Sequence, residues 1–159
     1  QMKKLSVLAL AAVMSASAFA AKVGVVNTQE LFYKYSKTKV IDQNLKKQGA
    51  SLENTINQKQ VELKKLQLEL QSKGEKITDA EKKSFEDKVK ALDKFVRDSQ
   101  MKMDKERNAR LQEVEKTMTN AINKVAKADK YDYVLEAGAV KFGGTDITAK
   151  VLQEMEKTK

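Results

Sequence analysis

The segment from Ser36 to Lys127 spans 92 residues without a proline, and Gly49 and Gly74 are its only glycines. Apolar residues recur along it at alternating steps of three and four, a spacing typical of a helical seam and not of a filled globular core. Because Gly74 lies near the middle of the segment, we expect two antiparallel helical legs. A chain that gives most of its length to such an arm is suited to reaching, holding or connecting, and not to a reaction.

The first twenty residues have the composition of a secretory signal peptide. Two lysines precede an apolar run from Leu5 to Met14, and small residues follow it. The sequence Ala18-Phe19-Ala20 matches an Ala-x-Ala cleavage site. The apolar run is about half of the ~20 residues that a membrane span needs. We therefore predict a signal peptide over 1–20, export, and a soluble mature chain.

The residue types that the chain lacks limit its chemistry. Without cysteine it has no disulfide framework, and without histidine it lacks the commonest general base and the commonest metal ligand. The carboxylates alternate with lysines along the helical segments, a pattern typical of ion-paired surface. Gly143-Gly144 has neither the spacing nor the following lysine of a phosphate loop, and it indicates a turn. We therefore predict no enzymatic activity, no cofactor and no metal ion.

The chain is strongly basic. Its formal net charge is +9, and loss of two lysines with the signal leaves +7. In a cytosolic protein this excess would suggest nucleic acid as the partner. For an exported chain the acidic partners are unfolded acidic proteins, lipopolysaccharide and anionic lipid, so we predict no nucleic-acid binding. Most of the lysines fit a solvated helix surface.

The helical seam is narrow and interrupted. Lys59 and Lys73 take two of its positions, and the step from Met103 to Leu111 is eight residues, which turns the apolar stripe around the helix. Each leg spans about 65–75 Å at 1.5 Å per residue. Such helices need a partner but bind it weakly. The seam residues are Leu45, Leu52, Ile56, Leu63, Leu66, Leu70 and Ile77 in the first leg, and Phe85, Val89, Leu92, Val96, Met103, Leu111, Val114, Met118, Ala121 and Val125 in the second.

Local signals place the turn between the two legs. Ser72-Lys73-Gly74 ends the first helix, since glycine tolerates the left-handed backbone that closes a helix. Thr78 and Glu81 form a capping box that starts the second helix. We predict a coiled-coil-like helical hairpin arm over 36–127, with its tip near 73–78.

The residues on either side of the arm predict a small β-rich body, formed by 21–35 and 128–159. The β-branched run Lys22–Val26 reads as a strand, and Asn27 with Glu30 starts a helix with a capping pair. The N-terminal strand meets the C-terminal segments only if the arm doubles back.

The C-terminal segments complete this body. Tyr131–Ala137 and Val140–Phe142 read as strands joined by a turn at Gly138, and a final amphipathic helix starts at Asp146-Ile147-Thr148. The predicted fold class is α+β and mostly α, with a small β-rich oligomerisation body and a long antiparallel helical-hairpin arm.

The predicted body is too small to be stable alone, because it offers three strands and two short helices. Its N-terminal strand is apolar on both faces, as expected where a sheet is buried on both sides. We therefore predict self-association through the body, with the arms projecting. The predicted interface residues are Val23, Val25, Val26, Val134, Leu135, Val140 and Phe142.

Two motifs resemble the Skp/OmpH family of periplasmic chaperones. Val23-Gly24-Val25-Val26-Asn27, followed by Glu30-Leu31-Phe32, is similar to the start of the mature family members. Asp132–Val140, followed by Asp146–Leu152, is similar to their closing strands and helix. The charged hairpin between the motifs fits in length, so the resemblance covers the whole mature chain.

The resemblance implies a periplasmic homotrimer whose β-rich body carries three helical tentacles around a cavity, and which holds unfolded outer-membrane proteins without ATP. It also implies lipopolysaccharide binding by basic residues low on the tentacles. The candidate residues for client or anionic-lipid binding are Lys102, Lys105, Arg107 and Arg110. The alternative is a structural or adaptor coiled coil of the periplasm. An adaptor arm needs a continuous apolar docking stripe, whereas Lys, Gln, Glu and Asp dominate the outer face here.

Overall fold

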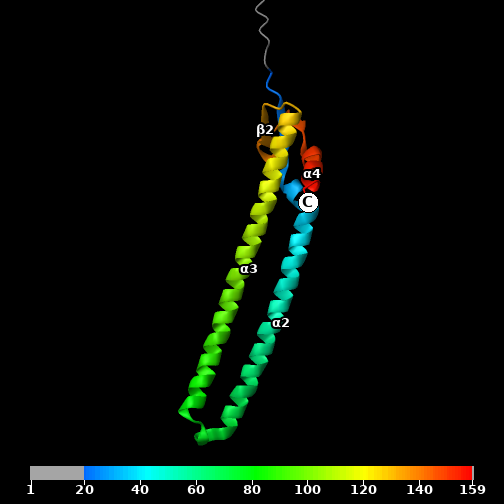
Figure 1. Ribbon diagram of the computed structural model, residues 1–159. Coiled ribbons are helices and arrows are strands. Elements are labelled where there is room, and N and C mark those ends of the chain that lie inside the picture. Colours follow the sequence, from blue (N-terminus) through cyan, green and yellow to red (C-terminus); the bar gives the residue numbers. More distant parts are fainter. Residues whose placement is uncertain (1–19, 159) are drawn as a thin grey trace, which may run out of the picture.

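The computed structural model describes residues 20–158, so the predicted signal peptide lies outside the described residues except for its last position. Two long antiparallel helices extend from a small body at one end of the molecule (Figure 1). None of the described helices is long and apolar enough to cross a bilayer. The elements in chain order are β1 (Val23–Val26), α1 (Thr28–Lys34), α2 (Ser36–Lys73), the 3₁₀ turn η1 (Gly74–Lys76), α3 (Asp79–Ala128), β2 (Tyr133–Glu136), the 3₁₀ turn η2 (Ala137–Ala139), β3 (Thr145–Asp146) and α4 (Thr148–Glu156).

The tip of the hairpin has the local structure that the sequence predicts. Helix α2 ends at Lys73, and the following Gly74 has φ of 56° and ψ of −124°, a backbone conformation that glycine adopts far more readily than other residues. The backbone N–H of Glu81 donates to the Thr78 hydroxyl at 3.1 Å, which caps α3. Lys73 forms an ion pair with Glu81 at 2.6 Å and joins the two legs across the turn.

A break at Tyr35 separates the short helix α1 from the arm helix α2. Its backbone is extended, with ψ of 123°, and its side chain is 1% exposed. Burial of this large side chain in the body therefore accompanies the change in helix direction. The first residue of α2 is held in turn by α4, because the backbone N–H of Ser36 donates to Glu156 at 2.8 Å. This contact ties the base of the arm to the C-terminal helix.

The sheet contains three parallel strands in the order β2-β1-β3. The predicted strand at Val140–Phe142 is wrong, because this segment is irregular and the third strand is Thr145–Asp146. The positive φ angles of Gly143 and Gly144 (90° and 83°) turn the chain back so that β3 lies beside β1. A side chain on Gly144 would place its Cβ 2.5 Å from Val25 Cγ2, so this approach requires glycine.

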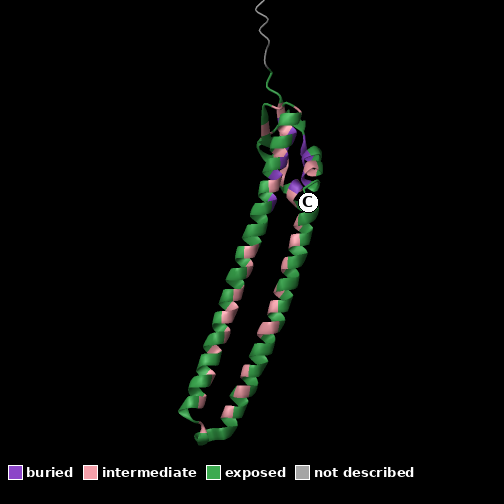
Figure 2. Cartoon of the chain, viewed as in Figure 1, coloured by how far each residue is buried: buried purple, intermediate pink, exposed green. Residues whose placement is uncertain are grey.

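The hydrophobic core lies entirely at the body end of the molecule, and within 20–158 helix α2 has no buried residue (Figure 2). Along the rest of the hairpin the seam residues are half-buried, and Leu111 is exposed. The end of α3 therefore belongs to the core, while most of the arm is held only by its seam. The core consists of Val26, Leu31, Tyr35, Val114, Met118, Ala121, Val125, Ile147, Val151 and Met155.

Candidate functional site

The two lysines that interrupt the predicted seam have partners within the arm. Lys59 Nζ lies 5.0 Å from the centre of the Phe95 ring, within range of a cation–π interaction. Lys73 forms the ion pair with Glu81 described above. Both contacts are near the surface, where solvent weakens them. The legs are thus joined by many weak contacts, which leaves the arm adaptable.

The four predicted basic residues lie around the middle of α3, between its tip and the body, and their side chains do not form one cluster. With 3.6 residues per turn, Lys105 and Arg107 point about 200° apart around the helix. Arg107 donates to Asp104 at 3.3 Å, and Arg110 donates to both carboxylate oxygens of Glu113 at 3.1 Å. These acids neutralise part of the charge of the predicted set.

The structure brings Arg110 together with two lysines of α2 that the sequence reasoning missed. Lys37 and Lys47 line a groove of about 670 Å³ between the legs, with Arg110 on the opposite helix. Glu106 and Glu113 lie in the same groove, so its excess positive charge is small. Counting residues back from the tip along both legs would have placed Lys47 about one helical turn from Arg110, whereas Lys37 lies ten residues, or roughly 15 Å, from Lys47.

The sheet presents one covered face and one uncovered face. Register pairs Val25 with Leu135 and Gly24 with Val134, and residues paired in this way point to the same side of a sheet. Val26 is 3% exposed and Val134 packs against the core, so both side chains contribute to the core of their own chain. Val23, Val25 and Leu135 point to the other side and are only partly covered. This uncovered face extends the predicted interface to Tyr133, which the sequence reasoning missed.

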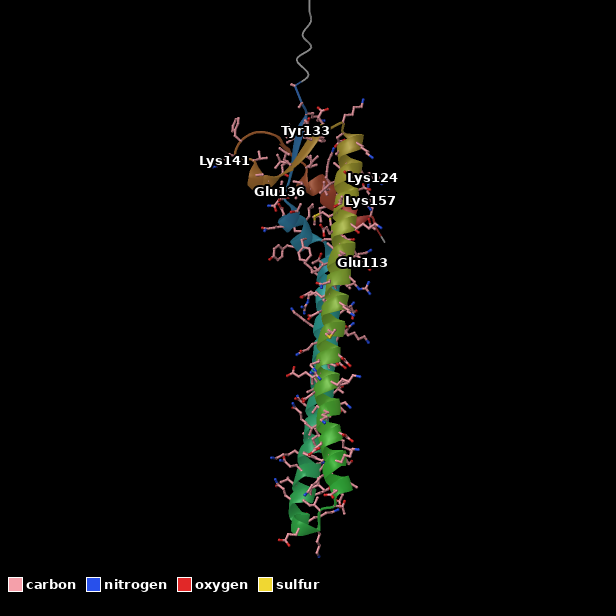
Figure 3. The ribbon with its side chains drawn as sticks, turned by 90° about the vertical axis from the view of Figure 1, so that its left-hand side faces the viewer. Glu113, Lys124, Tyr133, Glu136, Lys141 and Lys157 are labelled. Carbon is pink, nitrogen blue, oxygen red and sulfur yellow. The ribbon has the colours of Figure 1, made fainter. Side chains whose placement is uncertain are left out.

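The loop after β2 carries the remaining two residues of the predicted interface. Val140 is half-buried, and Phe142 is 97% exposed. Figure 3 shows the neighbouring Lys141 on a loop that projects away from α3, whereas Lys124 lies on that helix. Nearly all of one aromatic side chain is therefore available to a partner, together with the uncovered face of the sheet.

The ionisable groups with shifted pKa values lie in surface ion pairs or beside the core. Burial raises the pKa of Tyr35, and the nearby carboxylate of Glu156 adds to this effect. Within residues 20–158, no group of three or more acidic side chains is placed to hold a metal ion. Hydrogen bonds from lysine lower the pKa of three carboxylates: Lys73 acts on Glu81, Lys150 on Asp129 and Lys124 on Glu154.

Comparison with known proteins agrees with the arrangement of body and arm. A crystal structure from Caulobacter crescentus, described as an OmpH-like outer membrane chaperone, superposes with a TM-score of 0.65 at 18% identity and covers 87% of this chain and 86% of its own. The chaperone protein Skp of Yersinia enterocolitica is 28% identical, with 94% of each chain covered. The model of the family "Outer membrane protein (OmpH-like)" matches residues 22–155. The chain therefore belongs to the OmpH-like outer membrane protein family.

Proposed function

We propose that this protein is an ATP-independent holding chaperone of the periplasm, which binds unfolded outer-membrane β-barrel proteins between its helical arms and prevents their aggregation. One observation carries the proposal: a long hairpin without buried residues along α2 extends from a body that holds the whole core. Such an arm can bend and offer many weak contacts, which suits partners that have no fixed shape. The membership in a family with a chaperone relative supports the same function.

We further propose that three copies assemble through their bodies, with the arms enclosing the client. The uncovered face of the sheet, formed by Val23, Val25, Tyr133 and Leu135, supplies an apolar surface for this contact, and Phe142 adds to it. Strands β2 and β3 are also edge strands, whose free backbone groups are available for pairing with another chain. The number three comes from the family resemblance, and the physical argument supports self-association.

The alternative function, an adaptor with a fixed docking partner, fits the arm less well. Val40, Val61 and Leu68 are half-exposed apolar residues that share one side of α2 at multiples of seven residues. Lys47 and Asn54 occupy the positions between them, so the stripe is discontinuous. A tight docking interface needs a contiguous apolar centre. The arm is therefore better suited to transient contacts.

Aggregation of a client measures the proposed activity directly. We expect the protein, without nucleotide, to suppress the turbidity of an outer-membrane β-barrel protein diluted from urea, at about one trimer per client. If turbidity at low salt is unchanged by the protein, the holding function is wrong and the adaptor takes its place. Light scattering on the same sample measures the mass of the complex and tests the trimer separately.

Electrostatic attraction is the proposed first step of capture, because the chain carries +7 without its signal and the clients are expected to be acidic. Screening shortens the reach of these charges from ~30 Å at 0.01 M salt to ~10 Å at 0.1 M. Stopped-flow association should therefore slow as salt rises. An unchanged association rate would refute the electrostatic step and leave the holding function intact.

The proposed client or anionic-lipid residues are tested by charge-neutral variants in two matched sets. Changing the predicted set (Lys102, Lys105, Arg107 and Arg110) to Gln should slow capture of the client and weaken flotation of the protein with anionic vesicles. A control set on the tip half of α3 removes the same charge. Equal slowing by both sets would mean that total charge matters and position does not. The two sets are Lys102, Lys105, Arg107 and Arg110, and Lys82, Lys83, Lys88 and Lys90.

A further inference from the structure

A groove at the base of the arm differs in chemistry from the other grooves of the hairpin. It lies between α1 and α3, has a volume of about 600 Å³ and contains no lysine or arginine among its lining residues. The grooves farther along the arm include basic side chains such as Lys59, Lys88 and Lys47. In a chain of net charge +9, a groove free of basic residues marks a surface with a different partner chemistry. The apolar lining consists of Phe32, Tyr33, Leu111, Val114, Met118 and Ile122.

The walls of this groove are partly uncovered. Tyr33 is 75% exposed and Leu111 is 40% exposed, while Val114 and Met118 form a buried floor that continues into the core. The rings of Phe32 and Tyr33 meet edge to face, with their centres 6.2 Å apart. Aromatic rings favour this geometry, and a third ring placed in the groove can extend it. The methionine in the floor adds a side chain that repacks easily around different shapes.

The polar rim of the groove is rich in hydrogen-bond acceptors. Glu115 is its one charged side chain and has no ion-pair partner in the described part of the chain. Gln29 supplies an amide oxygen from the α1 side. An ionised carboxylate only accepts hydrogen bonds, and the polar ends of tyrosine and tryptophan donate them. An apolar floor below acceptors therefore fits a side chain with a ring body and a donor at its end.

We propose that this groove is a binding subsite for tyrosine and tryptophan side chains of the client. The inference rests on the proposed function and deepens it by naming the client feature that is recognised. Membrane β-barrels carry girdles of aromatic residues at both interfaces, so an unfolded barrel chain offers many such side chains. The volume of the groove falls in the range of small-ligand sites and suffices for an aromatic ring with its neighbours. Phenylalanine fills the floor in the same way but has no group that donates a hydrogen bond to Glu115.

Tryptophan fluorescence gives a direct test, because the protein contains no tryptophan. The probe is a neutral ten-residue peptide of alternating valine and threonine with one central tryptophan, titrated with the full protein. We expect a blue shift of its emission on binding and displacement by the same peptide with tyrosine. The phenylalanine peptide should compete about tenfold less well, which corresponds to ~1.4 kcal/mol. Equal competition by the two peptides would overturn the donor recognition.

Substitutions in the groove test whether the tryptophan peptide binds there. Tyr33→Ala combined with Leu111→Gln should weaken binding of the tryptophan peptide about tenfold, a difference of ~1.4 kcal/mol. Glu115→Gln should reduce the preference for tyrosine over phenylalanine. The matched control is Met101→Gln, since Met101 is 57% exposed on the same helix and lines none of the grooves described above. Peptide affinity that is equal in the groove variants and the control would overturn the subsite.

Three further outcomes separate the subsite from the other proposals. If Tyr33→Ala with Leu111→Gln lowers the mass of the assembly, the groove is a contact between copies of the chain and the subsite is wrong. If the protein suppresses client aggregation but does not bind the peptide, the subsite is wrong and the chaperone proposal stands. If the peptide binds and client aggregation is unaffected, the groove binds aromatic side chains, but both its role in client recognition and the holding function are wrong.

Discussion

Replacement of Gly144 by alanine should destabilise the body, and the structure allows its two causes to be separated. Its φ of 83° is a conformation that costs an alanine roughly 1–2 kcal/mol. The added Cβ would lie 2.5 Å from Val25 Cγ2, and overpacking of this kind costs typically about 1–3 kcal/mol. We therefore expect Gly144→Ala to lower the free energy of unfolding by about 2–5 kcal/mol.

Two other glycines serve as matched controls. Gly74 has a φ of 56° and nothing within 4 Å of an added Cβ, so Gly74→Ala should show the backbone strain alone, roughly 1–2 kcal/mol. Gly138 has an open environment and no positive φ. Gly138→Ala should therefore leave stability unchanged or raise it by up to about 1 kcal/mol, because alanine restricts the unfolded chain.

Urea unfolding followed by far-ultraviolet circular dichroism measures the three changes. The protein concentration must be held constant, because the proposed self-association would make apparent stability depend on concentration. The Cβ added in Gly144→Ala is expected to push β3 away from β1. Light scattering of the same variants reports whether this displacement also alters the mass of the assembly. If Gly144→Ala is no more destabilising than Gly74→Ala, the close packing of β3 on β1 is wrong.

The remaining predictions concern assembly, arm motion and pH. Val25→Asp with Leu135→Asp should yield monomers by light scattering, because both side chains lie on the uncovered face of the sheet. Amide hydrogen exchange should be faster over 66–85 than in the core end of α3, because the tip half has only half-buried seam contacts. The pKa of Glu154 is lowered by its hydrogen bond from Lys124, so the stability that this pair supplies is present above the ordinary pKa of a glutamate and lost as the pH falls through the lowered pKa. Thermal unfolding at pH 7 and pH 3 should show a smaller acid loss in Glu154→Gln.

Each of these three predictions has a contradicting result. Val40→Asp on the exposed side of α2 is the control for assembly, and monomers of this variant would mean that the arms contribute to the contact. Equal protection from exchange along the whole arm would indicate a rigid strut and favour the adaptor function. An identical acid loss in wild type and Glu154→Gln would mean that the pair with Lys124 does not stabilise the body.

The arm was predictable from the sequence because its signals are local. Seam spacing, Gly74 and the capping box at Thr78 each act within one or two helical turns, so the hairpin and its tip follow without knowledge of the rest of the chain. The helix start at Asn27 was predictable for the same reason, and the backbone N–H of Glu30 donates to the Asn27 side chain at 3.0 Å. Long-range contacts have little influence on where these helices begin and end.

The sheet was harder to predict because its order depends on distant residues. The run Val140–Phe142 has strand-forming residues but does not join the sheet, because the fit of Gly144 against β1 places Thr145–Asp146 beside β1 instead. The face of each valine also depends on register, which pairs Gly24 with Val134 across more than one hundred residues. The alternation of apolar residues along the strand could not by itself predict that the Val26 side chain packs in the core and that the Val25 side chain does not. The groove between α1 and α3 needs the same long-range information.

The positions of the core and the seam divide the chain into two parts that mutations can test separately. Val114 to Val125 fix the end of α3 in the body, so the proposed assembly contact is carried by a part of the molecule that the arm's tip does not contact. The rest of the hairpin has no buried residue that a conservative surface change would disturb. Variants of the uncovered sheet face should therefore alter the mass of the assembly, and variants of the arm should alter client binding with the mass unchanged. This separation suits the proposed holding function, because the arm can adapt to a client while the body supplies the stability.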